Sequence, residues 1–75
     1  MMTAEIITNR LKEHIPTAQI RATDMTGGGD HWQVRIRAAE FKGKTLIQQH
    51  QMVYQALGEL MKSQIHALSL DTGEA

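Results

Sequence analysis

The four histidines of this 75-residue chain are the side chains best able to do chemistry. His66 stands in the tetrad Ile65-His66-Ala67-Leu68, and His31 directly follows the tract Gly27-Gly28-Gly29-Asp30. A histidine at the entry of an apolar segment is either a core residue or an imidazole that another molecule can use. The chain has no cysteine, so it has no thiolate nucleophile and no thiolate metal ligand. A soft metal centre would therefore need sulfur from another molecule.

His31 and His66 are expected at accessible positions. The glycine tract predicts a flexible hairpin loop that carries His31, whereas His66 lies at the start of a predicted strand. Sequence spacing does not bring the two rings together, and each ring is equally compatible with a structural role and with a ligand role. Two imidazoles are too few for a zinc site, which takes three or four protein ligands, but they could form part of a site that another protein completes.

The other two histidines have simpler interpretations. His50 falls on the apolar stripe of a predicted helix, between Leu46 and Val53, which favours a half-buried ring with one nitrogen bonded to a neighbour. His14 lies at the end of the first predicted helix, where the carbonyl dipole favours a protonated ring. We expect His14 to be structural or exposed.

Motifs and charge argue against an enzyme and against a general nucleic-acid binder. The glycine tract leads into a strand and lacks the lysine and hydroxyl residue that complete a phosphate-binding loop. Ser63 and Ser69 stand in no nucleophile-elbow pattern, and spacing suggests no pairing of histidine with aspartate. Eight basic and eight acidic residues give a net charge of zero, whereas nucleic-acid binders usually carry a positive excess. We expect no catalytic activity and no small-molecule substrate.

The spacing of apolar residues predicts a small α+β domain over residues 1–75. Thr3 can cap a first helix, which ends before Pro16. The first two strands can pair as a hairpin, and the third, after a helical crossover, can lie parallel to one of them. We expect a three-stranded sheet with the helices packed on one face. The predicted elements are a helix over 3–14, strands over 18–25 and 32–38, a helical region over 45–62 that can divide in two, and a strand over 65–70.

The same patterns predict which side of each element faces the core. In the second strand, the tryptophan side is the core side, while arginine and glutamine alternate toward solvent. In the helical region, one apolar stripe is expected to face the sheet. The predicted core residues are Ile6, Ile7, Leu11, Ile15, Ile20, Ala22, Trp32, Val34, Ile36, Ala38, Leu46, Ile47, His50, Val53, Tyr54, Leu57, Leu60, Met61, Leu68 and Leu70.

The two ends of the chain carry weaker structural signals. Residues 1–3 and the acidic segment 71–75 are expected to fray. The segment 1–11 contains Glu5 and Arg10 and lacks a continuous apolar stretch. We therefore expect neither a secretory signal nor a membrane span, and a cytoplasmic location.

Five basic side chains could form one patch. Arg21, Arg35 and Arg37 fall on the solvent face of the first two strands, and Lys42 and Lys44 follow nearby. We favour a solvated sheet face whose charges protect its edges. The alternative is a binding surface for an acidic partner or a nucleic acid.

Three motifs, in their order and spacing, resemble the BolA family. The resemblance covers about residues 5–70, and it implies the family's α-β-β-α-α-β fold, which is similar to the class II KH arrangement. The motifs are Phe41-x-Gly43-Lys44, His50-x-x-Val53-Tyr54-x-x-Leu57 and Ile65-His66-Ala67-Leu68.

The resemblance implies a non-enzymatic partner of monothiol glutaredoxins, in a heterodimer that shares a 2Fe-2S cluster for iron-sulfur trafficking or for iron and redox regulation. The glutaredoxin and its glutathione would supply sulfur, and the isolated chain would hold no cluster. The histidine of the Ile-His-Ala-Leu motif and a second ligand from the hairpin loop would come from the BolA-like protein. Here these positions carry His66 and His31. Partner contacts are expected from Phe41, Gly43, Lys44, His50 and Tyr54.

The chain also departs from the family pattern. Gln49-His50-Gln51 stands where Arg-His-Arg is common, so two positive charges are missing from a helical surface proposed to touch DNA. The Gly-x-x-Gly clamp of KH proteins is absent because the glycines stand in the hairpin, and the customary tryptophan-containing end is missing. A DNA-binding transcriptional regulator of the BolA type therefore remains the alternative, with Arg35, Arg37, Lys42 and Lys44 as its contacts.

Overall fold

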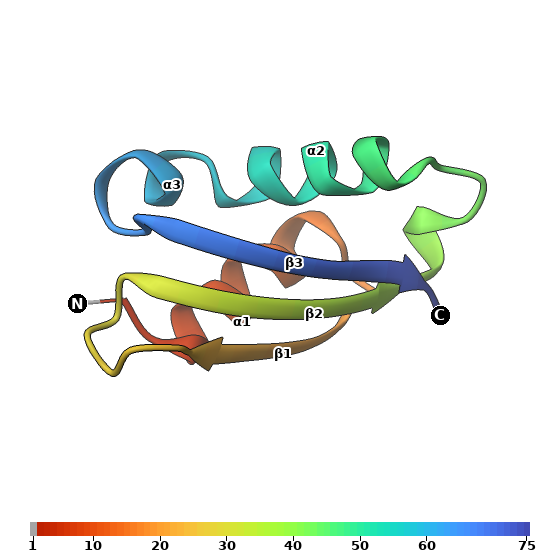
Figure 1. Ribbon diagram of the computed structural model, residues 1–75. Helices are drawn as coiled ribbons and strands as arrows, with labels where there is room; N and C mark the ends of the chain where they lie inside the picture. Colours follow the sequence, from red (N-terminus) through yellow and green to blue (C-terminus); the bar gives the residue numbers. More distant parts are fainter. Residues whose placement is uncertain (1) are drawn as a thin grey trace.

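The computed structural model describes residues 2–75, whose elements follow the order α-β-β-α-α-β (Figure 1). This order and the three-stranded sheet confirm the predicted fold class. Within residues 2–75, no helix combines the length and the apolar content needed to cross a bilayer. The elements are α1 (Ala4–His14), β1 (Gln19–Asp24), β2 (His31–Ala38), the short 3-10 helix η1 (Ala39–Phe41), α2 (Leu46–Leu57), α3 (Glu59–Ser63) and β3 (Ala67–Glu74).

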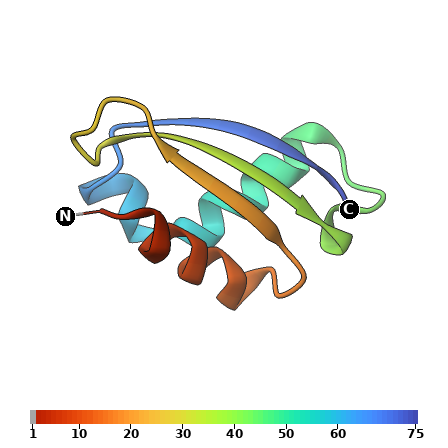
Figure 2. The same ribbon diagram turned by 90° about the horizontal axis from the view of Figure 1, so that it is seen from below.

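The sheet has the strand order β1-β2-β3, with β2 in the centre. β1 pairs with β2 in antiparallel register, as expected for a hairpin, and β3 pairs with β2 in parallel register. The parallel pairing follows from the connection, since α2 and α3 carry the chain back along the sheet before β3 begins. Figure 2 shows the helices together on one side of the sheet, so among the described residues the other side carries no helix.

α1 begins and ends where the sequence predicts. The Thr3 hydroxyl accepts a hydrogen bond of 3.2 Å from the backbone N–H of Ile6, which satisfies one of the free donors at the helix start. The helix ends at His14, ahead of Pro16, whose ring disfavours a helical conformation for the residue before it. Ile7 and Leu11 are buried, whereas Ile6 is 42% exposed and does not belong to the core as predicted.

The predicted helical region divides in two at Gly58. Thr45 and Gln48 form a capping box at the start of α2, in which each side chain accepts a hydrogen bond from the backbone of the other. Gly58 has a positive φ of 51°, a conformation that favours glycine, and it ends α2 and precedes α3.

The buried face of α2 differs from the predicted stripe. Leu46 and Ile47 are 60% and 71% exposed, so they do not contribute to the core as predicted. Gln49 is buried instead, because its amide is satisfied on both sides: Nε2 donates to the carbonyl of Lys44 at 3.0 Å, and Oε1 accepts from the Thr72 hydroxyl at 2.7 Å. A polar residue thus occupies a core position that an apolar pattern could not predict.

β2 forms the centre of the core, as predicted. Its alternate residues Trp32, Val34, Ile36 and Ala38 are all buried. They pack with Ile7, Leu11, Phe41, Val53 and Leu57 from the helical layer, while Leu68 and Leu70 of β3 are partly buried against the same cluster.

The C-terminal segment differs from the expected frayed end. Residues 71–74 belong to β3 and pair with residues 35–38 of β2, and the backbone N–H of Ala75 donates to the carbonyl of Ala38 at 3.4 Å. The backbone groups of β2 stabilise this polar segment, which has no strand-like pattern of its own. At the other end, Met2 is buried and Thr3 caps α1, while residue 1 lies outside the described residues.

Candidate metal centre

The parallel pairing of β2 with β3 brings His31 and His66 to the same end of the sheet. His31 is the first residue of β2 and lies opposite Ala67, the first residue of β3. His66 directly precedes Ala67, and its backbone N–H donates to the carbonyl of Asp30 at 2.8 Å. His31 and His66, whose proximity could not be predicted from their spacing in the sequence, are therefore near neighbours at this end of the sheet.

His31 lies on a strand and not in the hairpin loop, which corrects the sequence-based expectation. Its backbone carbonyl accepts a hydrogen bond of 2.8 Å from Met25, so pairing continues past the end of β1. The side chain is half-buried, at 45% exposure, and Nδ1 lies 3.0 Å from Oδ1 of Asp30. Among residues 2–75, no hydrogen-bond partner engages the other ring nitrogen, Nε2.

His66 is exposed and immediately precedes β3. Its backbone is held by the bond to Asp30, while its imidazole makes no hydrogen bond to a side chain or backbone group within residues 2–75. A ring sealed in the interior with both nitrogens engaged could not bind an external metal. The exposed ring of His66 meets the accessibility that a ligand requires.

Asp30 joins the two histidines, and sequence reasoning missed it. Its carboxylate contacts the ring of His31, and its backbone carbonyl accepts from His66 at 2.8 Å and from Ala67 at 3.2 Å. The hydrogen bond from His31 holds the pKa of the Asp30 carboxyl below its ordinary value; partial burial opposes this, and the charges of His31 and His66 add to the lowering. The only signal in the sequence was the adjacency of aspartate and histidine at a loop end, which is not specific.

The hairpin loop that carries Asp30 is held by hydrogen bonds, although its glycines predicted a flexible tract. The Asp24 carboxylate accepts from the backbone N–H groups of Gly27 and Gly29, each at 2.9 Å. The indole Nε1 of Trp32 donates to the carbonyl of Gly29 at 2.9 Å. Gly29 has a φ of 77°, a conformation that other residues rarely adopt. The glycines thus permit a specific loop path that these bonds maintain.

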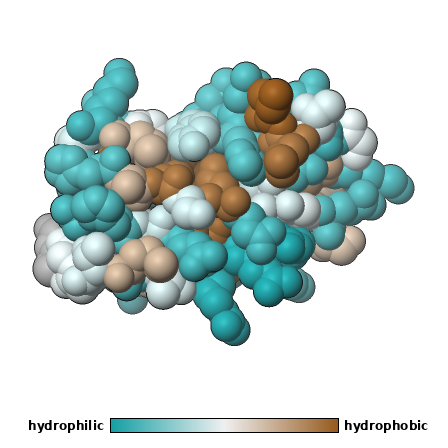
Figure 3. All heavy atoms as spheres, viewed as in Figure 1, coloured by the Kyte–Doolittle hydropathy of each residue, from teal (hydrophilic) through white to brown (hydrophobic). Residues whose placement is uncertain are grey.

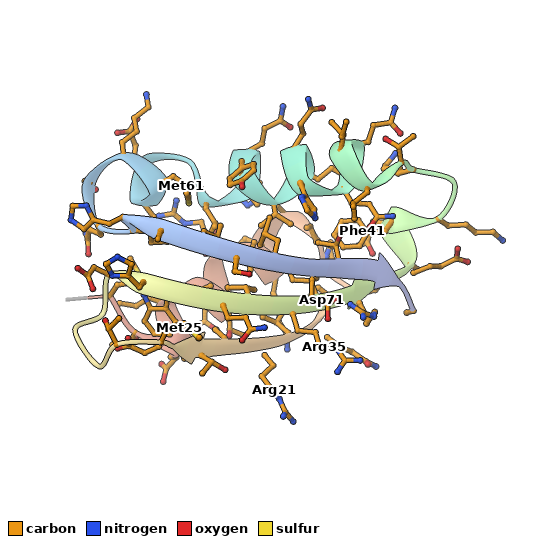
Figure 4. All side chains as sticks on the ribbon, viewed as in Figure 1. Arg21, Met25, Arg35, Phe41, Met61 and Asp71 are labelled. Carbon is orange, nitrogen blue, oxygen red and sulfur yellow. The ribbon has the colours of Figure 1, made fainter. Side chains whose placement is uncertain are left out.

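A shallow apolar hollow of about 300 Å³ lies beside His31. Met25, which is 58% exposed, lies at this hairpin end of the strands (Figure 4). An apolar wall next to an imidazole reduces solvent access to any metal bound there. The hollow is lined by Met25, Thr26, His31, Trp32, Ala67, Leu68 and Ser69.

The described residues supply two imidazoles to this end of the sheet and not a complete metal cage. Within residues 2–75, no group of three or more histidine, cysteine, aspartate or glutamate side chains is placed to hold a metal ion. Imidazole nitrogens are good ligands for iron as well as for zinc. The donor set therefore fits a half-site, in which a second molecule provides the remaining ligands.

The family of the chain is shown by sequence comparison. A sequence model of the family described as "BolA-like protein" matches residues 2–74. The chain belongs to the BolA-like protein family. Protein RP812 of Rickettsia prowazekii is 37% identical over 71 residues, covering 95% of this BolA-like chain and 92% of RP812. BolA-like protein 3 of Homo sapiens is 46% identical over 68 residues, covering 88% of this chain but only 63% of the human protein.

Solved structures support the same assignment of fold. The structure of a bol-like protein from Babesia bovis matches this BolA-like chain with a TM-score of 0.86 at 27% identity, covering 99% of this chain and 86% of that one.

A further sequence relative, the DNA-binding transcriptional regulator BolA of Haemophilus influenzae, is 41% identical over 44 residues, or 59% of this chain and 43% of that protein.

The residues expected to contact a partner do not gather at the end of the sheet that carries His31 and His66. Phe41 is 1% exposed and belongs to the core, and its contact with a partner stays a prediction. Gly43 and Lys44 are exposed in the turn after η1, at the other end of β2. Seven residue steps along β2 separate the two ends by roughly 23 Å. The turn and the two histidines are therefore distinct regions of the surface.

His50 and Tyr54 lie on α2, away from the end of the sheet that carries His31 and His66. His50 is half-buried as predicted, but its buried Nε2 has no hydrogen-bond partner among residues 2–75, which differs from the expected bond to a neighbour. Tyr54 is 43% exposed, in contrast to its predicted core position. Together with Leu46 and Ile47 it adds apolar surface to α2, where Figure 3 shows protruding hydrophobic residues.

The five basic residues of the predicted patch divide into two groups. Arg37 binds Asp71 through an ion pair of 3.0 Å and a bond of 3.1 Å to the Asp71 carbonyl, and Arg35 lies 3.9 Å from the same carboxylate. Arg21 extends away from the sheet (Figure 4). Lys42 and Lys44 are exposed in the distant turn. Asp71 thus offsets part of the charge on the open sheet face, which favours the interpretation as a solvated face.

Proposed function

We propose that this BolA-like chain is a non-enzymatic partner of a monothiol glutaredoxin and that the two proteins share a 2Fe-2S cluster. His66 and His31 would be the ligands from this chain, and the glutaredoxin with its glutathione would supply sulfur. The proposed role is iron-sulfur trafficking or iron and redox regulation. The observation that carries the proposal is the parallel register of β2 and β3, which brings these two histidines to one end of the sheet.

The chemistry of the chain's own residues supports this role. A bound cluster with imidazole in place of thiolate on one iron has a higher reduction potential than one with thiolates alone. His31 presents Nε2, because Nδ1 is engaged by Asp30, and the exposed ring of His66 can turn toward a partner. An imidazole binds a metal only through a nitrogen that carries a free lone pair.

The choice of partner carries a consequence for location. A glutaredoxin that supplies glutathione works in a thiol-reducing compartment, and the cytoplasm is our expectation. The absence of cysteine from the sequence is compatible with such a division of labour, since all sulfur ligands would come from the partner and its glutathione.

The direct test is to mix the chain with a glutathione-loaded, cluster-bearing monothiol glutaredoxin and to record the visible absorption. We expect a shift with the wild-type chain and none with His66→Ala. His14→Ala is the matched control, because His14 is exposed at the end of α1, and this variant should behave as wild type. An unchanged spectrum with the wild-type chain, or a full shift with His66→Ala, would contradict the proposal.

DNA binding is the second candidate function, favoured by the name of the Haemophilus influenzae relative and by the exposed Lys42 and Lys44. Phosphate contacts make the affinity for duplex DNA fall as salt rises. We would expect Lys42→Gln with Lys44→Gln, and Arg35→Gln with Arg37→Gln, each to weaken binding and to reduce this salt dependence. Binding below detection at low salt would rule this function out, independently of any cluster.

A further inference from the structure

We infer that Asp30 is a positioning residue for His31, holding the imidazole so that Nε2 is the nitrogen presented to a metal. The inference rests on the proposed function and deepens it, because it concerns how this chain prepares one of its two candidate ligands. Nothing in the sequence pattern or in the family motifs singles out Asp30.

The first step of the argument is the contact itself. Oδ1 of Asp30 lies 3.0 Å from Nδ1 of His31. An ionised carboxylate only accepts hydrogen bonds, so Nδ1 must carry a proton, and in the neutral ring Nε2 then carries the free lone pair. Metal-bound histidines commonly donate their second ring N–H to a carboxylate or carbonyl in this way, which sets the tautomer and the ring orientation.

The second step is that the carboxylate is itself held in place. The hydroxyl of Thr26 donates to Oδ1 of Asp30 at 3.4 Å. On the same side, a Cβ added to Gly28 would lie 3.2 Å from Oδ1, so the loop backbone closely flanks this oxygen. The bonds that the Asp24 carboxylate accepts from the loop, and the bond that Trp32 donates to it, maintain the path of this backbone. The position of the carboxylate is thus determined by its surroundings and not by His31 alone.

The third step concerns His66. The backbone carbonyl of Asp30 accepts from His66 at 2.8 Å and from Ala67 at 3.2 Å, so the same residue determines where the chain enters β3. These two bonds do not involve the side chain. A substitution of Asp30 therefore removes the contact with the ring of His31 while leaving the placement of His66 intact, which separates the two effects in an experiment.

The contact is not explained by stability. The side chains of His31 and Asp30 are 45% and 39% exposed, and ion pairs at such exposure contribute little to folding. We expect Asp30→Ala to retain its circular dichroism spectrum and its melting temperature. A change in the ring of His31 without a change in folding is what a positioning role predicts and a structural role does not.

The first experiment uses the isolated chain at about pH 8.5, well above the ordinary imidazole pKa. Long-range ¹⁵N–¹H NMR identifies which ring nitrogen of His31 carries the proton. We expect the Nδ1–H tautomer in the wild type, the Nε2–H form in Asp30→Ala, and retention of Nδ1–H in Asp30→Asn, whose amide oxygen can still accept. Asp71→Ala, a carboxylate bound by arginines on the same sheet face, is the control and should change nothing at His31. An Nε2–H tautomer in the wild type, or no change in Asp30→Ala, overturns the inference.

The second experiment uses the cluster-loaded pair with the glutaredoxin. Loss of a carboxylate that orients a metal-bound histidine typically weakens binding by about 10- to 100-fold, and we expect Asp30→Ala to lose the cluster faster by a similar factor. Equal retention by Asp30→Ala and wild type overturns the positioning role while leaving the proposed function standing. A wild-type pair that holds no cluster overturns the proposed function, and the NMR experiment then still decides whether Asp30 sets the tautomer of His31.

Discussion

The backbone carbonyl of Asp30 accepts a 2.8 Å hydrogen bond from the backbone N–H of His66. This bond joins the loop between β1 and β2 to the residue that precedes β3. Because β3 runs parallel to β2, both strands begin at the same end of the sheet, and their first residues are neighbours. The result is a polar corner with two imidazoles and one carboxylate, built on a core whose central residue at this end is Trp32.

Trp32 should be essential for stability. We expect Trp32→Ala to lower the free energy of unfolding by about 3 to 5 kcal/mol, because the indole is 4% exposed and packs in the core. Urea denaturation followed by circular dichroism measures this change. Trp32→Phe retains much of the packing but loses the hydrogen bond to Gly29, and it should cost less than the alanine variant. Wild-type stability in Trp32→Ala would show that the faces of β2 are wrongly assigned.

The buried amide of Gln49 should contribute more to stability than its exposed neighbour Gln51. We expect Gln49→Ala to cost about 1 to 3 kcal/mol, since the Lys44 carbonyl and the Thr72 hydroxyl both lose a partner in a poorly solvated region. Gln51→Ala, at an exposed position two residues along the same helix, should change stability by less than about 0.5 kcal/mol. Similar denaturation midpoints for the two variants would argue against the bridging role of Gln49.

The carboxyl of Glu40 should titrate below its ordinary range. The hydroxyl of Thr17 donates to this carboxylate and holds the pKa of Glu40 below its ordinary value of 4.5, while partial burial opposes the effect and the backbone N–H of Thr17 adds to it. A lowered folded-state pKa means that this contact stabilises the fold above about pH 4.5, and that the contribution is lost as the pH falls through the lowered pKa.

Removing the hydroxyl tests this sign. In Thr17→Ala we expect the pKa of Glu40 to rise toward its ordinary value and the acid-side loss of stability to become smaller, as measured by NMR titration of the side-chain carboxyl carbon. Thr23→Ala removes an exposed threonine hydroxyl on β1 and should leave the pKa of Glu40 unchanged. A pKa of Glu40 that is the same in Thr17→Ala as in the wild type would refute the assigned cause.

Arg21 and Arg35 are direct cross-strand partners on the open sheet face, so two like charges oppose each other. We expect Arg21→Glu to raise the free energy of unfolding by about 0.2 to 1 kcal/mol, because an opposite-charge pair replaces a repulsive one. The gain should shrink in high salt, where exposed charges are screened. Lys42→Glu makes the same charge change at an exposed position in the turn after η1 and is the control. A destabilised Arg21→Glu would indicate that Arg21 has a stabilising partner.

The order of the elements could be predicted because its signals are local. Thr3 and Thr45 cap helices through bonds to residues three positions along the chain, and the alternation around Trp32 needs no information beyond β2 itself. The buried face of α2 and the extent of β3 could not be predicted in this way. Gln49 is buried only because Lys44 and Thr72 satisfy its amide, and residues 71–74 form a strand only because β2 offers an edge.

For the candidate site, the sequence alone identified the possible ligands: His31 in a predicted hairpin loop and His66 at the start of a predicted strand. The lack of cysteine assigned any sulfur ligand to another molecule. Only the tertiary structure decided that His31 and His66 share one end of the sheet and that Asp30 contacts both. The physical reason is that parallel strands pair through backbone hydrogen bonds between segments far apart in the chain, and no local pattern of side chains encodes which residues those bonds will join.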